Sequence, residues 1–74
     1  MNVKQKIEYL RNCLFDTLET YRQVLNNRPD FPNRVRWLFD ERNEISSLAT
    51  TLHDAEIITD AEYFDALKQV EKYV

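Results

Sequence analysis

Apolar residues recur along the first third of the chain at alternating steps of four and three residues, the spacing of one face of an α-helix. The members of this stripe are Val3, Ile7, Leu10, Leu14, Tyr21 and Val24, with Thr17 filling the gap between Leu14 and Tyr21 and with Leu18 and Leu25 widening the stripe. The pattern predicts a long amphipathic helix over residues 3–25. Asn26 and Asn27 suit the left-handed position that follows a helix, and Pro29 prevents its continuation.

A second stripe with helical spacing predicts a helix over residues 32–53. Its expected buried positions are Phe31, Val35, Leu38, Ile45, Leu48, Ala49 and Leu52. Asp30 or Asn33 can cap the N-terminus of this helix with a side-chain oxygen. Pro32 suits its first turn, because a backbone N–H is not needed there.

The third expected helix covers residues 60–73 and has the clearest start in the chain. Thr59 and Glu62 have the spacing of a capping box, in which each side chain accepts a hydrogen bond from the backbone N–H of the other. Ile58 and Tyr63 can form the hydrophobic contact that often accompanies it. The residues expected to face inward are Phe64, Leu67, Val70 and Val74.

Together these patterns predict an all-α fold, a three-helix antiparallel bundle with two long helices and a shorter third. The 74 residues suit a single domain, 1–74. The short third helix cannot cover the full length of the first two. Part of their apolar seam is therefore expected to stay exposed unless a second chain covers it.

Charge is distributed unevenly along the chain. Residues 1–39 hold 7 basic and 4 acidic side chains, a balance of +3, whereas residues 40–74 hold 3 basic and 9 acidic, a balance of −6. A protein polarised in this way can be steered to a charged partner or can pair head-to-tail with itself. We expect a protein partner and a homodimer.

The sequence holds few groups suited to catalysis or metal binding. It has one cysteine, Cys13, one histidine, His53, and no glycine, so phosphate-cradling loops and zinc-ligand spacings are absent. We expect no enzyme activity, no catalytic or metal-binding residues and no cofactor. No apolar run is long enough to cross a membrane, and the first residues lack the apolar region of a secretory signal, so a cytoplasmic location is expected.

Several aromatic and basic residues lie outside the predicted buried stripes. Tyr9 and Phe15 point away from the first stripe; Phe15 is either partly covered within the chain or part of a second, partner-binding face. Arg36 and Trp37 lie at the rim of the second helix. The predicted function is a small protein-binding module, an adaptor or inhibitor that uses Tyr9, Phe15, Arg36 and Trp37. Small chains of this kind are common in phages and mobile elements, which suggests a viral protein by association only.

The alternative is a nucleic-acid-binding protein that uses the arginine-rich and tryptophan-containing start of the second helix. Arg28, Arg34 and Arg36 can contact phosphates, and Trp37 can stack on a base. The sequence pI of about 5.0 and an acidic third helix count against this alternative, because nucleic-acid-binding domains usually carry a basic balance.

Overall fold

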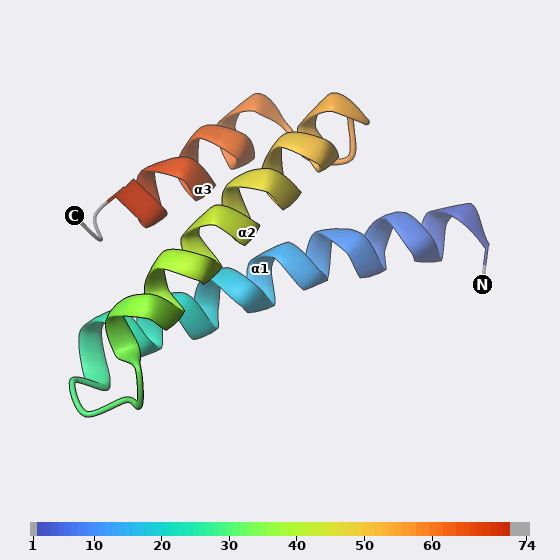
Figure 1. Ribbon diagram of the computed structural model, residues 1–74. Helices are drawn as coiled ribbons and strands as arrows, with labels where there is room; N and C mark the ends of the chain where they lie inside the picture. Colours follow the sequence, from blue (N-terminus) through green and yellow to red (C-terminus); the bar gives the residue numbers. More distant parts are fainter. Residues whose placement is uncertain (1, 72–74) are drawn as a thin grey trace.

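The computed structural model describes residues 2–71 and places three helices in them. They are α1 (Val3–Asn27), α2 (Arg34–Asp54) and α3 (Asp60–Glu71), and they run antiparallel in sequence order (Figure 1). The predicted three-helix bundle, with two long helices and a short third, is confirmed. Residues 72 and 73, the end expected for the third helix, and Val74, which was expected to face inward, lie outside the described residues.

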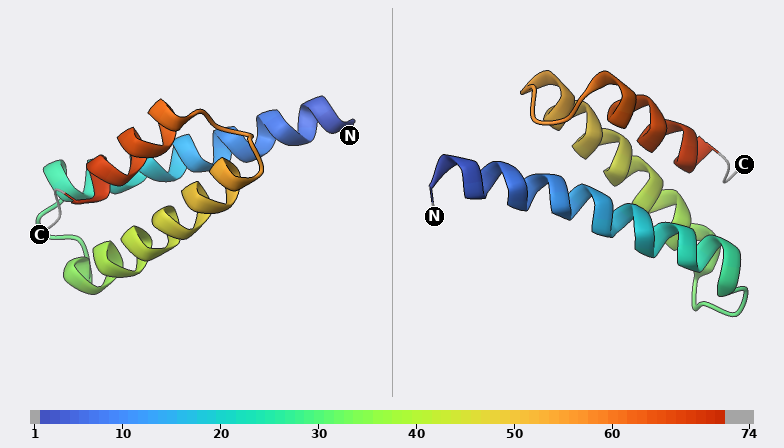
Figure 2. Two further views of the ribbon diagram at one scale, coloured as in Figure 1. Left: turned by 90° about the horizontal axis from the view of Figure 1, so that it is seen from above. Right: turned by 180° about the vertical axis from the view of Figure 1, so that it is seen from behind.

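Helix α2 packs along both of its neighbours, whereas α1 and α3 touch over a shorter length. Figures 1 and 2 show the first turns of α1 running past the α2–α3 connection and leaving the rest of the bundle. With a rise of about 1.5 Å per residue, α1 is about 38 Å long and α3 about 18 Å. Three helices therefore pack together over most of the bundle, whereas the N-terminal turns of α1 extend alone past the α2–α3 connection. We call this second end the open end of the bundle.

The core forms where the apolar faces of the three helices meet. Its buried members are Leu14, Leu18, Tyr21, Val24, Leu38, Ile45, Ala49, Leu52, Ile58, Ala66 and Val70. Tyr21 is fully buried, and its hydroxyl donates a 3.4 Å hydrogen bond to the carbonyl of Val70. This bond fastens the C-terminal half of α1 to the last turn of α3.

The α1–α2 connection differs in detail from the expected one. Asn26 and Asn27 lie within α1, and Arg28 follows it in the C-cap position. Helix α2 begins at Arg34, two residues later than predicted, after Asn33 in a left-handed conformation with φ 52° and no side-chain cap. The expected place of Pro32 in the helix is therefore wrong. Because Asn33 has positive φ, the chain turns sharply at that residue before α2 starts.

The α2–α3 connection is a tight turn in which Glu56 is left-handed, with φ 60°. The N–H of Ile57 donates to the carbonyl of Leu52 at 2.8 Å, and the N–H of Glu56 donates to that of His53 at 3.0 Å. This is the Schellman pattern, which normally uses glycine at the left-handed position. Since the chain has no glycine, Glu56 takes that conformation with its side chain exposed.

The predicted capping box at the start of α3 is confirmed. The N–H of Glu62 donates to Thr59 Oγ1 at 3.1 Å, and the N–H of Thr59 donates to Glu62 Oε1 at 2.9 Å. A second capping box, which the sequence analysis did not identify, starts α1: the Asn2 side chain accepts from the N–H of Gln5, and the Gln5 side chain accepts from that of Asn2. Local hydrogen bonds therefore define both helix starts.

Several residues predicted to be buried are exposed. Phe64 is 65% exposed because it lies about 200° from Ala66 around α3, nearly opposite the core. Val35 is exposed in the first turn of α2, beside the α1–α2 connection. Val3, Ile7 and Leu10 are exposed because α1 extends beyond its neighbours. Their periodicity identifies a helix face correctly but not whether another element covers it.

Replacing Glu56 with glycine should stabilise the protein, since a left-handed backbone costs a residue with a Cβ about 1 kcal/mol. We expect the free energy of unfolding to rise by about 0.5–1 kcal/mol, which is roughly 4 °C in Tm for a chain of this size. Thermal unfolding followed by circular dichroism measures this change. Glu56→Ala is the matched control, because it removes the charge and keeps the Cβ; an equal gain there would contradict the backbone explanation.

Candidate interaction surface at the open end of the bundle

The N-terminal turns of α1, residues 3–10, form an extension that we call the α1 overhang. Its apolar side chains are Val3, Ile7 and Leu10, which are 73%, 38% and 36% exposed. Their spacing of four and three places them on one face, in line with the buried Leu14 and Leu18. The core stripe of α1 therefore continues onto exposed surface beyond the point where α2 ends and α3 begins.

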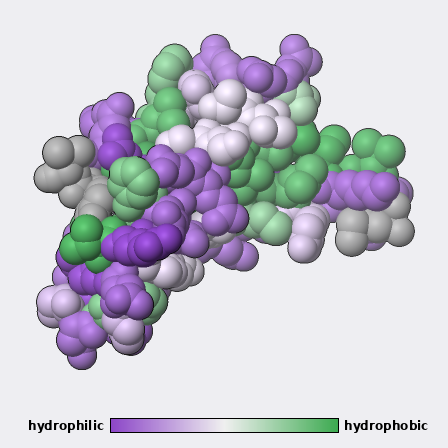
Figure 3. Space-filling model, in the orientation of Figure 1, coloured by the Kyte–Doolittle hydropathy of each residue, from purple (hydrophilic) through white to green (hydrophobic). Residues whose placement is uncertain are grey.

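The surface view shows the same continuity. In Figure 3, apolar surface extends from the bundle onto the side of the overhang that faces the α2–α3 connection, with hydrophilic side chains beside it. Figures 1 and 2 show the ribbon of the overhang diverging from that connection. The apolar face thus borders the open space between the overhang and the α2–α3 connection, which we call the opening.

Arg11 marks the point where the bundle closes and the overhang begins. Its Nη1 donates to the carbonyl of Ile57 and to Glu62 Oε1, each at 3.0 Å, and its Nη2 donates to Glu62 Oε2 at 2.7 Å. The hydrogen bonds from Arg11, followed by that from the backbone of Thr59, lower the pKa of Glu62. The guanidinium also lies 5.5 Å from the ring centre of Phe15. Arg11 therefore joins α1 to the beginning of α3 through several charge-assisted contacts.

The two sides of the opening differ in charge. The overhang carries the exposed Lys4 and Lys6 beside its apolar face, together with one exposed acid, Glu8. The α2–α3 connection opposite carries the exposed acids Asp54, Glu56 and Asp60. His53 Nε2 lies 2.5 Å from Asp60 Oδ1, and the ring of His53 stacks on Tyr63 at 4.4 Å. A basic, partly apolar helix end therefore lies beside an acidic turn.

The four residues predicted to bind a partner fall into two separate groups. Tyr9 lies exposed on the overhang, off its apolar face, and a hydrogen bond with Cys13 raises the pKa of its hydroxyl. Phe15 is half-buried against the core. Arg36 and Trp37 lie at the start of α2, toward the opposite end of the bundle. Their role in partner binding stays a prediction, but they do not form one surface.

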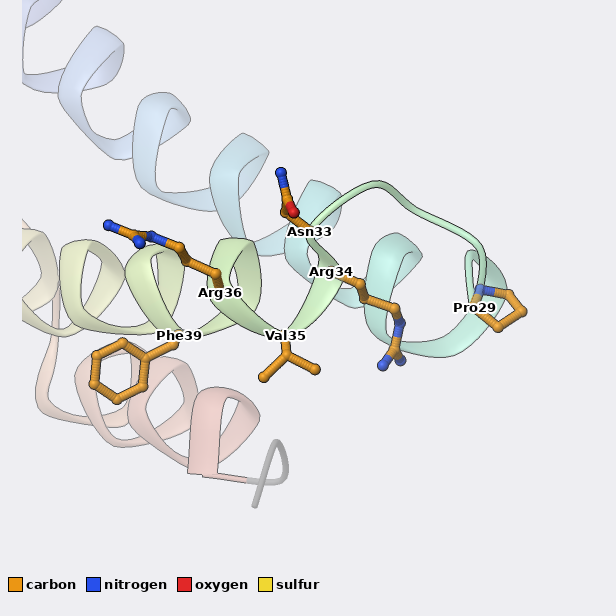
Figure 4. A pocket seen from close by; sticks show the side chains of 6 residues that line it. All are labelled: Pro29, Asn33, Arg34, Val35, Arg36 and Phe39. Carbon is orange, nitrogen blue, oxygen red and sulfur yellow. The ribbon is translucent and has the colours of Figure 1, made fainter.

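Around the start of α2, Pro29, Asn33, Val35 and Phe39 line a depression together with the arginines Arg34 and Arg36 (Figure 4). In that view Arg36 points away from Val35 and Phe39, across the helix. Arg36 lies 3.8 Å from Asp40 in an exposed ion pair. Positive charge is consequently not concentrated within the depression.

The groups invoked for nucleic-acid binding are also engaged within the chain. Arg34 Nη2 donates to the carbonyl of Leu25 at 2.7 Å, and Arg28 lies 5.6 Å from the ring centre of Phe31. Trp37 is half-buried, and its ring lies 5.1 Å from that of Phe31. These contacts favour a structural role for the segment, so the geometry adds no support to the nucleic-acid alternative.

Three residues of the candidate surface, Val3, Ile7 and Leu10, were not predicted from the sequence to bind a partner. They were predicted to form part of a helix stripe, and the aromatics off the stripe were assigned to the partner instead. A usable signal was present in the unequal helix lengths, which predicted an exposed seam. Residues 2–71 contain no group of three or more His, Cys, Asp or Glu placed to hold a metal ion. Within the same range, every helix is too short or too polar to span a membrane.

The described chain is thus an all-α three-helix bundle with an uncovered apolar helix end. Comparison with protein-family models, curated proteins and solved structures found no match. The geometry and charge of the surface itself are therefore the basis for proposing a function.

The contact between Arg11 and Glu62 should contribute to stability in a pH-dependent way. We expect a double-mutant cycle of Arg11→Met and Glu62→Gln to give a coupling energy of about 1 kcal/mol near neutral pH, since both groups are partly exposed. The lowered pKa of Glu62 means that this coupling is complete above the unfolded value of about 4.3 and is lost as the pH falls through the folded value.

Urea unfolding of the four proteins at several pH values measures the coupling. Arg22 and Glu19 form an exposed pair on α1 and provide a matched control, for which we expect a smaller coupling of about 0.3 kcal/mol. An Arg11–Glu62 coupling that stayed constant through acid pH would contradict the assignment.

Proposed function

We propose that this chain is a small, non-enzymatic protein-binding module that self-associates and acts as an adaptor or an inhibitor of a larger protein. The observation that supports the proposal is the exposed apolar face of the overhang, formed by Val3, Ile7 and Leu10. Apolar residues exposed singly are common, but a stripe continuous with the core and bordered by charge is typical of a binding surface.

The size of the face indicates what a partner has to provide. Full burial of an aliphatic side chain contributes about 1.5–3 kcal/mol relative to exposure. Burial of the surface that these three side chains still expose would therefore contribute roughly 3 kcal/mol to binding. A micromolar complex requires about 8 kcal/mol. The apolar face alone is therefore insufficient, and a partner must also engage the polar groups around it, including Lys4, Lys6 and the acidic turn.

Local structure prepares the overhang for binding. The Asn2–Gln5 capping box holds its first turn, and the rest continues directly from the packed part of α1. A helix formed before binding avoids the entropic cost of ordering a flexible segment. The same proposal includes a cytoplasmic location, which is consistent with a single half-buried cysteine. It also includes an origin in a phage or mobile element.

Site-specific photo-crosslinking in the native cells tests the proposal. A benzophenone side chain at position 3 should crosslink a protein, because Val3 is the most exposed residue of the apolar face. The matched control carries the same group at position 64, where Phe64 is exposed to a similar degree on α3, away from the overhang. The masses of the crosslinked products distinguish a second copy of the chain from another protein.

We expect the product from position 3 to be lost when Ile7 is replaced by aspartate, with helicity unchanged by circular dichroism. Equal crosslinking from positions 3 and 64, or none from either, would argue against the overhang as a binding surface.

A further inference from the structure

We infer that the partner covering the overhang is a second copy of this chain, packed antiparallel around a twofold axis close to Ile7. This inference rests on the proposed function, because it names the occupant of the same surface. The apolar face of each overhang would contact that of the other copy. Each helix would also enter the opening of the opposite bundle.

The shape of the chain permits such an arrangement. The overhang extends past the α2–α3 connection in both figures, so a helix laid antiparallel on its apolar face meets that connection end-on (Figures 1 and 2). With the axis at Ile7, Val3 of one copy lies opposite Leu10 and Arg11 of the other. The overlap of residues 3–11 is about 13 Å long at 1.5 Å per residue. The two bundles then lie beyond opposite ends of the overlap and do not compete for the same space.

Charge complementarity favours a second copy as the occupant. In the antiparallel arrangement, Lys4 of each overhang approaches the acidic turn with Asp54 and Glu56 of the other copy, and Lys6 lies opposite its exposed Glu8. The positive end of the α1 dipole approaches the same acidic turn. An unrelated acidic helix would match the lysines and leave the acidic turn opposed by like charge. A second copy suits both sides, because its overhang brings an apolar face and lysines to the acidic turn, and its own acidic turn receives the lysines of the first copy.

The overlap is short, so the dimer should be weak. Two helix ends of this length bury less than the roughly 1,200 Å² of a small stable interface. We expect a dissociation constant on the order of 100 μM. Because part of the attraction is between exposed charges, added salt should weaken the association.

Sedimentation equilibrium from about 10 μM to about 1 mM tests the inference, since this range spans the expected dissociation constant. The wild-type mass should rise toward that of a dimer. Val3→Asp and Ile7→Asp should remain monomeric throughout, and the matched control Phe64→Asp should associate like the wild type. Val3 is 73% exposed, so Val3→Asp is expected to fold even if Ile7→Asp does not.

A charge exchange provides the sharper test. Lys4→Glu places an acidic side chain of the overhang against the acidic turn, and Asp54→Lys with Glu56→Lys places a basic turn against the basic overhang. Each variant alone should associate at least about 10-fold more weakly, whereas a mixture should form a heterodimer of wild-type affinity because both contacts regain opposite charges. Failure of the mixture to associate would overturn the pairing.

A wild-type chain that is monomeric at all concentrations would also overturn the inference. If photo-crosslinking from position 3 still captured a different protein, the proposed binding of a larger protein would survive and only the identity of the occupant would be wrong. A dimer that Val3→Asp leaves unchanged would show that self-association uses another surface.

Discussion

The unequal length of the helices is the constraint on which the rest of this structure depends. Helix α1 has 25 residues and α3 has 12. The N-terminal turns of α1 therefore extend past the connection at which α2 ends and α3 begins. An apolar stripe that continues along the whole of α1 is therefore divided into a packed part and an exposed part. Burial stabilises the first part, and the second remains available to another molecule.

Polar contacts define the boundary between these parts. Arg11 binds Glu62 and the carbonyl of Ile57 at the point where apolar packing stops. Glu62 also completes the capping box of α3, so one carboxylate both starts a helix and holds the neighbouring one. Tyr21 performs the corresponding linkage at the far end of α3 through Val70. The short helix is thus joined to α1 near each of its ends.

The fold also brings the basic and acidic parts of the chain together at one end of the bundle. Basic residues come mainly from the first half and acidic residues from the second. Because α1 runs antiparallel to α2, its basic start lies at the same end of the bundle as the acidic α2–α3 turn. Two surfaces of opposite charge face the same opening, and this combination motivates both the proposed binding role and the proposed self-association.

The sequence by itself determined the number of helices and their order, and it gave their limits within residues 2–71 to within two residues, because periodic spacing and the Thr59–Glu62 capping box are local properties. It also indicated that part of the long helices would lack cover. Only the tertiary structure decided which apolar residues are buried: Val3 and Phe64 are exposed, whereas Phe15 packs against the core. Periodicity identifies the face of a helix, but burial depends on where neighbouring helices begin and end. For the same reason the exposed stripe of α1, rather than the aromatics beside it, became the candidate site.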